Sequence, residues 1–365
     1  MKVINILFAM VGLVLLIPES FDDWPVFRGN PRMTGTTTAA LPEQLRQLWT
    51  FACGDAVEGA PAIVGNRVFV ASMDGHLYAL DRDNGKEVWR TKLAPMKASP
   101  AFAKGRLYVG DVEGKVHAID AATGKRLWSF ETGGEITAGA NFFDDHLLIG
   151  SHDSTLYCLS TEGKKLWEYK IDGPINGSPA VADDRTFVAG CDSILHAVDA
   201  RTGKVIGTVD LDGQAGATAA ILGDQAFVGT MANQVVAIDW KKSKKSWTFE
   251  ARRRQQPFYS SAAVDEELLV VGCRDKKVYA LDRKTGEERW SFLTVGQVDA
   301  SPVICGNRIY IGCLSRDGDF YVLDRATGRQ LQHIELDSGV SGSPAVVDDR
   351  LIVGTEKGLV YCFGR

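Results

Sequence analysis

Short runs in which apolar residues alternate with small or polar ones recur along nearly the whole chain. Residues 106–130 read RLYVGDVEGKVHAIDAATGKRLWSF, and their alternation is typical of β-strands. Glu113-Gly114 and residues 121–124 predict two turns that separate three strands. Residues 98–103, ASPAFA, predict a further strand before these three. The unit is therefore a four-stranded antiparallel meander, which is one blade of a propeller.

This meander begins eight times, at intervals of about 40 residues, which is a propeller signature. The first strands start at GAPAIV (59–64), ASPAFA (98–103), TAGANF (137–142), NGSPAV (176–181), GATAAI (216–221), SSAAVD (260–265), ASPVIC (300–305) and SGSPAV (341–346). The last copy stops at residues 361–363, before its fourth strand, and LRQLWTF at 45–51 supplies a matching one. The pattern predicts an all-β, eight-bladed propeller of four-stranded antiparallel blades. An N-terminal strand completes the last blade and removes an open edge.

Most copies carry one phrase, as in AIDAATGKRLWSF at 118–130: Asp, a turn, Gly, Lys and Trp. The Asp carboxylate can accept backbone N–H groups of the turn, and the Gly can adopt a positive φ. The Trp falls on the outermost strand, where its burial between blades is worth about 2–3 kcal/mol. The phrase residues are Trp49, Trp89, Trp128, Trp167, Trp247, Trp290, Asp81, Asp120, Asp199, Asp282, Asp324, Gly85, Gly124, Gly203, Gly286 and Gly328, with Gly207 and Gln332 in the Trp register of two blades. We interpret the phrase as structural, because no nucleophile or base recurs with it.

The N-terminus carries an apolar run at residues 3–17, after Lys2. A run of this length is short for a membrane-spanning helix, which needs about 20 residues, and its setting is typical of a secretory signal. We expect residues 1–20 to be a signal peptide or an N-terminal anchor, 21–44 a lead-in segment, and 45–365 a single propeller. The protein is then exported to the periplasm or cell envelope, with membrane contact only through an uncleaved N-terminus. The cleavage point stays open.

Composition narrows the function classes. The net charge is −5, which argues against a nucleic-acid binder. The six histidines are scattered, and neither an H-x-x-x-H nor an H-E-x-x-H spacing occurs. Neither a G-x-S-x-G elbow nor a phosphate-binding G-x-x-x-x-G-K-[ST] loop is present. We therefore predict no catalytic residue and no metal ligand.

Seven cysteines occur without a C-x-x-C pair: Cys53, Cys158, Cys191, Cys273, Cys305, Cys313 and Cys362. Disulfide connectivity cannot be deduced from their spacing. We interpret them as small buried hydrophobes, because free Cys packs well inside strands.

The repeated form [AC]-[LI]-D-x-x-T-G-K-x-x-W around a ring of eight resembles the quinoprotein (PQQ-like repeat) β-propeller family. DWPVFRGNPRMTG at 23–35 resembles the lead-in of exported bacterial members. The chain resembles the non-enzymatic type, the B subunit of the outer-membrane assembly factor, more than the PQQ dehydrogenases. That resemblance implies a scaffold that binds other proteins or envelope components, without a cofactor, and we expect a monomer with a protein partner in the envelope.

The alternative is a PQQ- and calcium-dependent alcohol or sugar dehydrogenase. The resemblance then implies a quinone and Ca²⁺ in the central funnel and an Asp base. Dehydrogenases of the family often carry two adjacent cysteines near the quinone, which this chain lacks, and its blades leave few long loops for a cofactor lid. Acidic residues near turns, such as Asp74, Asp111, Glu113 and Asp153, are interpreted as turn residues.

The fifth blade departs most from the repeat. Its turn, AIDWKKSKKSW at 237–247, is rich in Lys, and the connector FEARRRQQPFYS at 249–260 contains three consecutive arginines. We expect the two basic clusters on opposite faces of the disc. Arg and aromatic residues are enriched at binding hot spots, so the predicted partner-binding residues are Arg252, Arg253, Arg254, Phe258 and Tyr259. A solvated loop without a role, or a polyanion site, stays open as an alternative.

Overall fold

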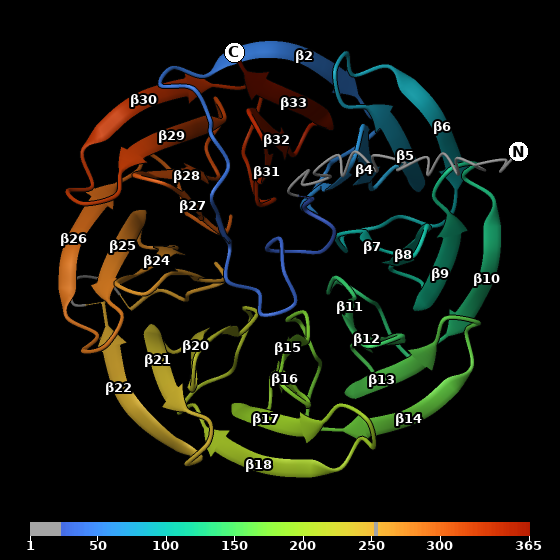
Figure 1. Cartoon of the computed structure of the whole chain (residues 1–365). Helices are drawn as coiled ribbons and strands as arrows, with labels where there is room; N and C mark the ends of the chain where they lie inside the picture. Colours follow the sequence, from blue (N-terminus) through green and yellow to red (C-terminus); the bar gives the residue numbers. More distant parts are fainter. Residues whose placement is uncertain (1–22, 252–254) are drawn as a thin grey trace, which may run out of the picture.

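The computed structural model describes residues 23–251 and 255–365, and in these the chain forms a ring of eight sheets around a central axis (Figure 1). No helix long and apolar enough to cross a membrane occurs among these residues. Each blade has four antiparallel strands, of which the first lies nearest the axis and the fourth forms the rim (Figure 1); in one sheet a short parallel strand, β1, adds a fifth. The predicted all-β, eight-bladed fold is confirmed.

The first four blades follow directly along the chain. Blade 1 is β3 (Ala62–Val64), β4 (Arg67–Ala71), β5 (His76–Asp81) and β6 (Glu87–Lys92). Blade 2 is β7 (Ala101–Ala103), β8 (Arg106–Gly110), β9 (Lys115–Asp120) and β10 (Arg126–Glu131). Blade 3 is β11 (Asn141–Phe143), β12 (His146–Gly150), β13 (Thr155–Ser160) and β14 (Lys165–Lys170). Blade 4 is β15 (Ala180–Ala182), β16 (Arg185–Ala189), β17 (Ile194–Asp199) and β18 (Val205–Asp210).

The last four blades complete the ring. Blade 5 is β19 (Ala220–Leu222), β20 (Gln225–Gly229), β21 (Gln234–Asp239) and β22 (Lys244–Glu250). Blade 6 is β23 (Ala263–Val264), β24 (Leu268–Cys273), β25 (Lys277–Asp282) and β26 (Glu288–Leu293). Blade 7 is β27 (Val303–Cys305), β28 (Arg308–Gly312), β29 (Asp319–Asp324) and β30 (Gln330–Glu335), and blade 8 is β31 (Ala345–Val347), β32 (Arg350–Gly354), β33 (Leu359–Gly364) and β2 (Arg46–Ala52).

Blade 8 closes the ring with strands from both ends of the chain. β2 pairs antiparallel with β33, from Arg46 opposite Gly364 to Ala52 opposite Leu359. Figure 1 shows β2 in blue beside the red C-terminal strands. This confirms that the N-terminal strand completes the last blade, and no edge is left unpaired by the missing fourth strand.

The core lies between the blades. The two middle strands of each blade are buried along nearly their whole length, because neighbouring blades cover both of their faces. The alternation read from residues 106–110 is therefore not an alternation of burial: Tyr108 is as buried as Leu107 and Val109. The rim strands alternate between exposed and partly buried positions, because only one face of each meets the next blade.

Every rim strand contains a β-bulge just before the Trp register. In blade 2 the register shifts between Arg126 and Trp128, so Leu127 has no partner opposite. A bulge places one extra residue in a strand and re-aims its side chains. Leu127 consequently faces solvent, while Trp128 turns into the gap toward blade 3.

Within the predicted lead-in of residues 21–44, residues 23–37 run across the centre of the ring (Figure 1), and from here on these residues alone are called the lead-in segment. Its carbonyl oxygens accept backbone N–H groups from the inner strands of six blades, and Asn141 of a seventh donates its side-chain amide. The pairs are Ile63 to Trp24, Phe102 to Pro25, Asn141 to Pro31, Val181 to Pro31, Ile221 to Arg32, Val264 to Thr34 and Ile304 to Gly35. β1 (Thr36–Thr37) ends the segment and pairs parallel with β27. The lead-in segment therefore satisfies the innermost edges of the sheets and caps one end of the central channel.

Candidate binding site in the central cavity

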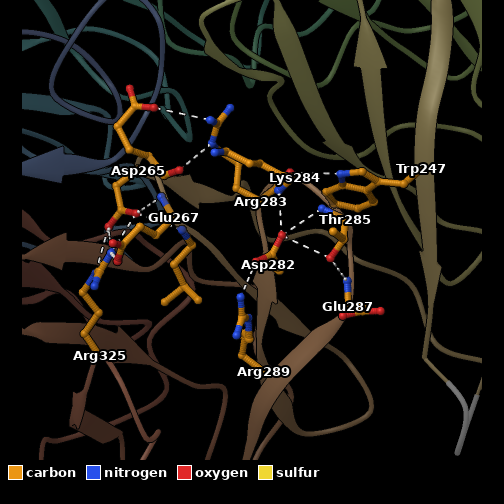
Figure 2. A network of polar contacts seen from close by, with 12 residues as sticks. Trp247, Asp265, Glu267, Asp282, Arg283, Lys284, Thr285, Glu287, Arg289 and Arg325 are labelled. Carbon is orange, nitrogen blue, oxygen red and sulfur yellow. Dashed lines mark hydrogen bonds and ion pairs between the residues drawn. The ribbon is translucent and has the colours of Figure 1, made fainter.

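The repeated phrase joins each blade to the next. Figure 2 shows the phrase in blade 6, where the Asp282 carboxylate accepts hydrogen bonds from the backbone N–H groups of Lys284 and Thr285 and forms an ion pair with Arg289. These contacts, the Arg289 guanidinium foremost, lower the pKa of Asp282 to about 2. The indole of Trp247 from blade 5 donates to the carbonyl of Arg283, 2.9 Å away.

The same indole bond recurs at every phrase Trp. The pairs are Trp49 to Arg82, Trp89 to Ala121, Trp128 to Thr161, Trp167 to Ala200, Trp247 to Arg283 and Trp290 to Arg325. Each indole also lies against the phrase Gly of the next blade, where a Cβ would come within 2.7 Å of the ring. The phrase residues therefore form a repeated contact that holds neighbouring blades together.

The two blades without a Trp show how the gap is filled otherwise. At Gly207, the neighbouring turn carries Ser243 at the usual Gly position, with φ 50°. Trp240 fills this gap instead: it is buried, donates to Gly223 and packs edge-on against Phe187 of blade 4. The repeat did not predict this role of Trp240. One signal was available in the sequence: a Trp directly follows the turn Asp in blade 5, and the preceding blade lacks its rim Trp.

Gln332 marks the other exception, beside the closure of the ring. Its side-chain amide exchanges two hydrogen bonds of 2.9 Å with the backbone of Leu45. The segment that leads into β2 therefore stands where other blades have a phrase turn, and an amide that both donates and accepts replaces the indole there.

All eight blades contribute to a central cavity of about 460 Å³. Its wall has two levels, each supplied once by every blade. The inner level is Ala60, Ser99, Gly139, Ser178, Thr218, Ser261, Ser301 and Ser343, and the mouth level, two residues earlier, is Glu58, Lys97, Thr137, Asn176, Gly216, Tyr259, Asp299 and Ser341. A connector leads from the rim strand of each blade to the inner strand of the next, and we call the face of the disc that carries these connectors the connector face. The mouth-level residues lie at the connector end of the inner strands, so the mouth opens on the connector face.

Six of the eight inner-level residues carry a hydroxyl group, and five of these hydroxyls join neighbouring inner strands. These five hydroxyl oxygens accept the backbone N–H of the equivalent residue one blade earlier, over 2.8–3.1 Å. The pairs are Ala60 to Ser99, Ser178 to Thr218, Thr218 to Ser261, Ser261 to Ser301 and Ser301 to Ser343. We call these six side chains, Ser99, Ser178, Thr218, Ser261, Ser301 and Ser343, the hydroxyl ring.

The lead-in segment closes the far end of the cavity. Phe27 lines the cavity, and its Cβ lies 3.3 Å from the position that a Cβ on Gly139 would take. Arg28, the next residue, is completely buried and donates from Nη2 to the carbonyl of Pro302, 2.5 Å away. The cavity is therefore open at the connector face and closed by the lead-in segment at the other end.

Charged side chains at the mouth are mostly paired. Asp299 binds Arg274 through two oxygens, and the Arg274 guanidinium lies 4.1 Å from the centre of the Tyr259 ring. Lys97 lies 3.3 Å from Glu135. Burial, together with the nearby carboxylates of Glu356, Glu135 and Asp55, raises the pKa of Glu58, while Lys97 opposes this rise.

The predicted binding residues fall in three places. Arg252, Arg253 and Arg254 lie outside the described residues. Phe258 is completely buried and packs near Tyr279, so its ring belongs to the blade interior. Tyr259 lines the mouth of the cavity. The binding role of these five residues stays a prediction. The structure adds that Tyr259 is part of the cavity wall.

The Lys-rich turn of blade 5 is largely neutralised by ion pairs. Lys241 pairs with Asp224, Lys242 with Asp239, and Lys245 with Asp212. These pairs are exposed, so they add little stability, but they leave little free positive charge on that turn.

The acidic turn residues near the connector face have structural partners. Asp74 accepts the hydroxyl of Tyr78 and the backbone N–H of Gly54, and Asp153 accepts the hydroxyl of Tyr157. Asp111 forms a buried 2.7 Å contact with His117. The structure pairs none of the seven cysteines, and six of them are buried.

The residues of the cavity do not fit a quinone with calcium. The described residues contain no group of three or more His, Cys, Asp or Glu side chains placed to hold a metal ion. PQQ carries three carboxylates, but among the described residues Lys97 alone is a cation that lines the cavity, and it faces Glu135. The oxygen ligands that Ca²⁺ needs are spread over separate blades, with Asp299 engaged by Arg274.

Sequence similarity relates the chain to a known propeller family. A family model described as "Outer membrane protein assembly factor BamB" matches residues 34–141, 112–206, 152–313 and 295–364. The chain is 34% identical over 82 residues to a polyvinylalcohol dehydrogenase of a Pseudomonas species, and 41% identical over 59 residues to the 1-butanol dehydrogenase (quinone) of Thauera butanivorans. These matches span 21% and 16% of this chain and only 12% and 9% of the relatives' lengths.

Solved structures share the fold. BamB from Moraxella catarrhalis has a TM-score of 0.75 at 19% identity, covering 88% of this chain and 98% of that one. A quinohemoprotein alcohol dehydrogenase from Comamonas testosteroni has a TM-score of 0.79 at 16% identity, covering 94% of this chain and 80% of the other. At such identities the likeness concerns the fold alone.

Proposed function

Because the chain belongs to the propeller family described as outer membrane protein assembly factor BamB, we propose that it is an exported, non-catalytic scaffold that binds another protein of the cell envelope. The observation that carries the proposal is the connector face: all eight blades contribute to one open mouth there, and the chemistry around it is recognition rather than reaction. Paired charges, an aromatic ring and a set of hydroxyl groups can orient a partner.

The competing function is a quinone-dependent dehydrogenase. It is favoured by the short stretches of 34–41% identity to dehydrogenases. The donor set of the cavity counts against it, since among the described lining residues Asp299 is paired with Arg274 and Lys97 with Glu135. A dehydrogenase also needs a base poised to take the alcohol proton, and Asp299 is held by Arg274.

Site-specific photo-crosslinking in intact cells tests the scaffold proposal. A photoreactive residue is placed at Val295, which is exposed on the connector face, and at Lys125, which is exposed in a turn on the opposite face. We expect one discrete adduct with an envelope protein from Val295 and none from Lys125. Adducts from Lys125 alone would place the partner on the wrong face and contradict the proposal.

The same purified protein distinguishes the second function. Titration with PQQ in the presence of Ca²⁺, followed by dye reduction with alcohols and sugars, should show neither binding nor turnover. Tight calcium-dependent binding with turnover would replace the scaffold by the dehydrogenase.

A further inference from the structure

The positive charge of Arg28 is not neutralised by any carboxylate among the described residues. Its side chain is completely buried, yet Nε and Nη1 have no hydrogen-bond partner among the described residues, and no described carboxylate forms an ion pair with it. Burial lowers the pKa of Arg28 to about 9, so the guanidinium remains protonated at neutral pH. An isolated buried charge is costly, and proteins normally pair it.

The backbone around Arg28 is arranged to hold this side chain in place. Arg28 itself has φ 62°, which is unfavourable for a residue with a Cβ. A Cβ at Gly35 would collide with the Arg28 guanidinium, so Gly35 is the residue that makes room for it. Strain of this kind persists where the surrounding structure enforces it, and it is a reason to look for a function.

Arg28 does not itself line the central cavity, but its guanidinium lies behind residues that border the cavity floor. It donates to Pro302, which directly follows Ser301 of the hydroxyl ring, and its central carbon lies 5.9 Å from the centre of the Phe27 ring, which lines the cavity. Its positive field therefore acts on the inner level of the cavity. In a medium of low dielectric, such a field reaches further than it does in water.

The hydroxyl ring offers free donors at the same level. Five of its six oxygens accept a backbone N–H, but within the described residues no acceptor takes a hydrogen from any of the six hydroxyls. A hydroxyl carries one donor, so each proton is available to a molecule in the cavity. Convergent O–H donors beside a buried cation suit an acceptor-only, negatively charged group.

We propose that the floor of the central cavity binds a carboxylate that enters from the connector face and rests on the hydroxyl ring, next to Arg28. The carboxylate belongs either to a free small organic acid or to an acidic side chain of a partner. The inference goes beyond the scaffold function, since a small acid would bind whether or not a partner docks.

The carboxylates at the mouth affect how easily an anion enters the cavity. Asp299 and Glu135 are neutralised by Arg274 and Lys97. Glu58 has no ion pair among the described contacts, so it opposes the entry of an anion. Replacing it by a neutral isostere should therefore strengthen carboxylate binding.

The experiment measures binding of malonate by calorimetry and by its effect on the melting temperature, with sodium chloride at matched ionic strength as the control. Wild-type protein should bind malonate and melt at a higher temperature in its presence. Arg28→Met should bind at least tenfold more weakly and lose the malonate-dependent rise. Its own melting temperature should not fall, because a buried unpaired charge has been replaced by an apolar chain. Glu58→Gln should bind several-fold more tightly.

Two further readouts keep the outcome decisive. Soaking crystals with 4-bromobenzoate, an aryl bromide that does not alkylate thiols, should give an anomalous bromine peak inside the cavity, above the hydroxyl ring. Acetyl-Gly-Asp-Gly-amide, compared with its Asn counterpart, tests a side-chain source: selective binding of the Asp peptide favours a partner residue, and binding of malonate alone favours a free acid. Equal malonate responses in wild type and Arg28→Met, or a melting response no larger than that to chloride, would overturn the proposal.

Discussion

Trp89 and Gly124 form one matched contact across the gap between blades 1 and 2. The indole donates to Ala121, and a Cβ on Gly124 would lie 2.7 Å from two atoms of the ring. Gly124 also has φ 73°. Between blades 4 and 5 both partners of this contact are replaced: Gly207 stands at the Trp position and Ser243 at the Gly position. The two positions are therefore expected to be energetically coupled.

A double-mutant cycle tests this coupling. Gly124→Ser should destabilise the wild type by the strain of its positive φ plus the collision with the indole. In a Trp89→Gly background the strain and a 3.0 Å contact with Thr91 Oγ1 remain but the collision with the indole does not, so the cost should be smaller by about 1–3 kcal/mol. Denaturant unfolding measures the four proteins. Gly105→Ser is the matched control, since Gly105 has φ 76° with nothing within 4 Å of an added Cβ. Equal costs of Gly124→Ser in both backgrounds would show that the contact is not coupled.

At this scale the sequence predicts repeated contacts well and unique ones poorly. The Trp-to-next-blade contact is predictable because six copies share one spacing. Trp240 is not, because it occurs once and its role depends on the space left by Gly207. Phe258 is predicted at a binding surface, yet it is buried. In a connector without periodicity, an aromatic residue gives no sign of which way it faces.

The turns are the elements in which the Asp of the phrase acts. Hydrogen bonds from a Thr side chain, foremost, lower the pKa values of Asp120, Asp199 and Asp324, and Lys242 does the same for Asp239. Each carboxylate is stabilised in its charged form in the folded state. An unfolded Asp has a pKa of about 3.9. The contribution of the turns is therefore present above that pH and is lost as the pH falls toward the lower folded values.

Acid titration of stability tests this contribution. The urea midpoint of the wild type should fall between about pH 4 and pH 2. A variant with Asn at Asp120, Asp199 and Asp324 should be less stable at pH 6, and its difference from the wild type should shrink toward pH 2. Because hydrogen bonds within the turn dominate these shifts, the difference should persist in high salt. A constant difference across the range would show that the carboxylate charge is unimportant.

The strands are predictable as elements, and the path of the lead-in segment is not. Eight inner-strand starts and the closing strand follow from a period that repeats. Residues 23–37 have no repeat and contain a two-residue strand, so their path around the ring is set by partners far away in sequence. Their role in closing the cavity follows from carbonyl groups, which every residue has, and not from any side-chain pattern.

At the scale of the molecule, two closures do different things. The pairing of β2 with β33 closes the ring at the rim, and the lead-in segment closes the channel at the axis. The first determines whether the propeller holds together. The second determines whether the cavity has one opening or two. Because they use separate residues, one closure can be removed while the other stays.

Deleting residues 23–37 while keeping β2 tests this separation by hydrogen exchange. The ring should remain folded, with β33 still protected by β2. The inner-strand amides that donate to the lead-in segment, such as those of Phe102, Ile221 and Val264, should exchange much faster, because their acceptors are gone. The amide of Val346 in β31 has no bond to the lead-in segment among the described residues, so its exchange should not change. Carboxylate binding should disappear with Arg28. If β33 also lost protection, the two closures would be one cooperative unit, and the lead-in segment would be part of what holds the ring together.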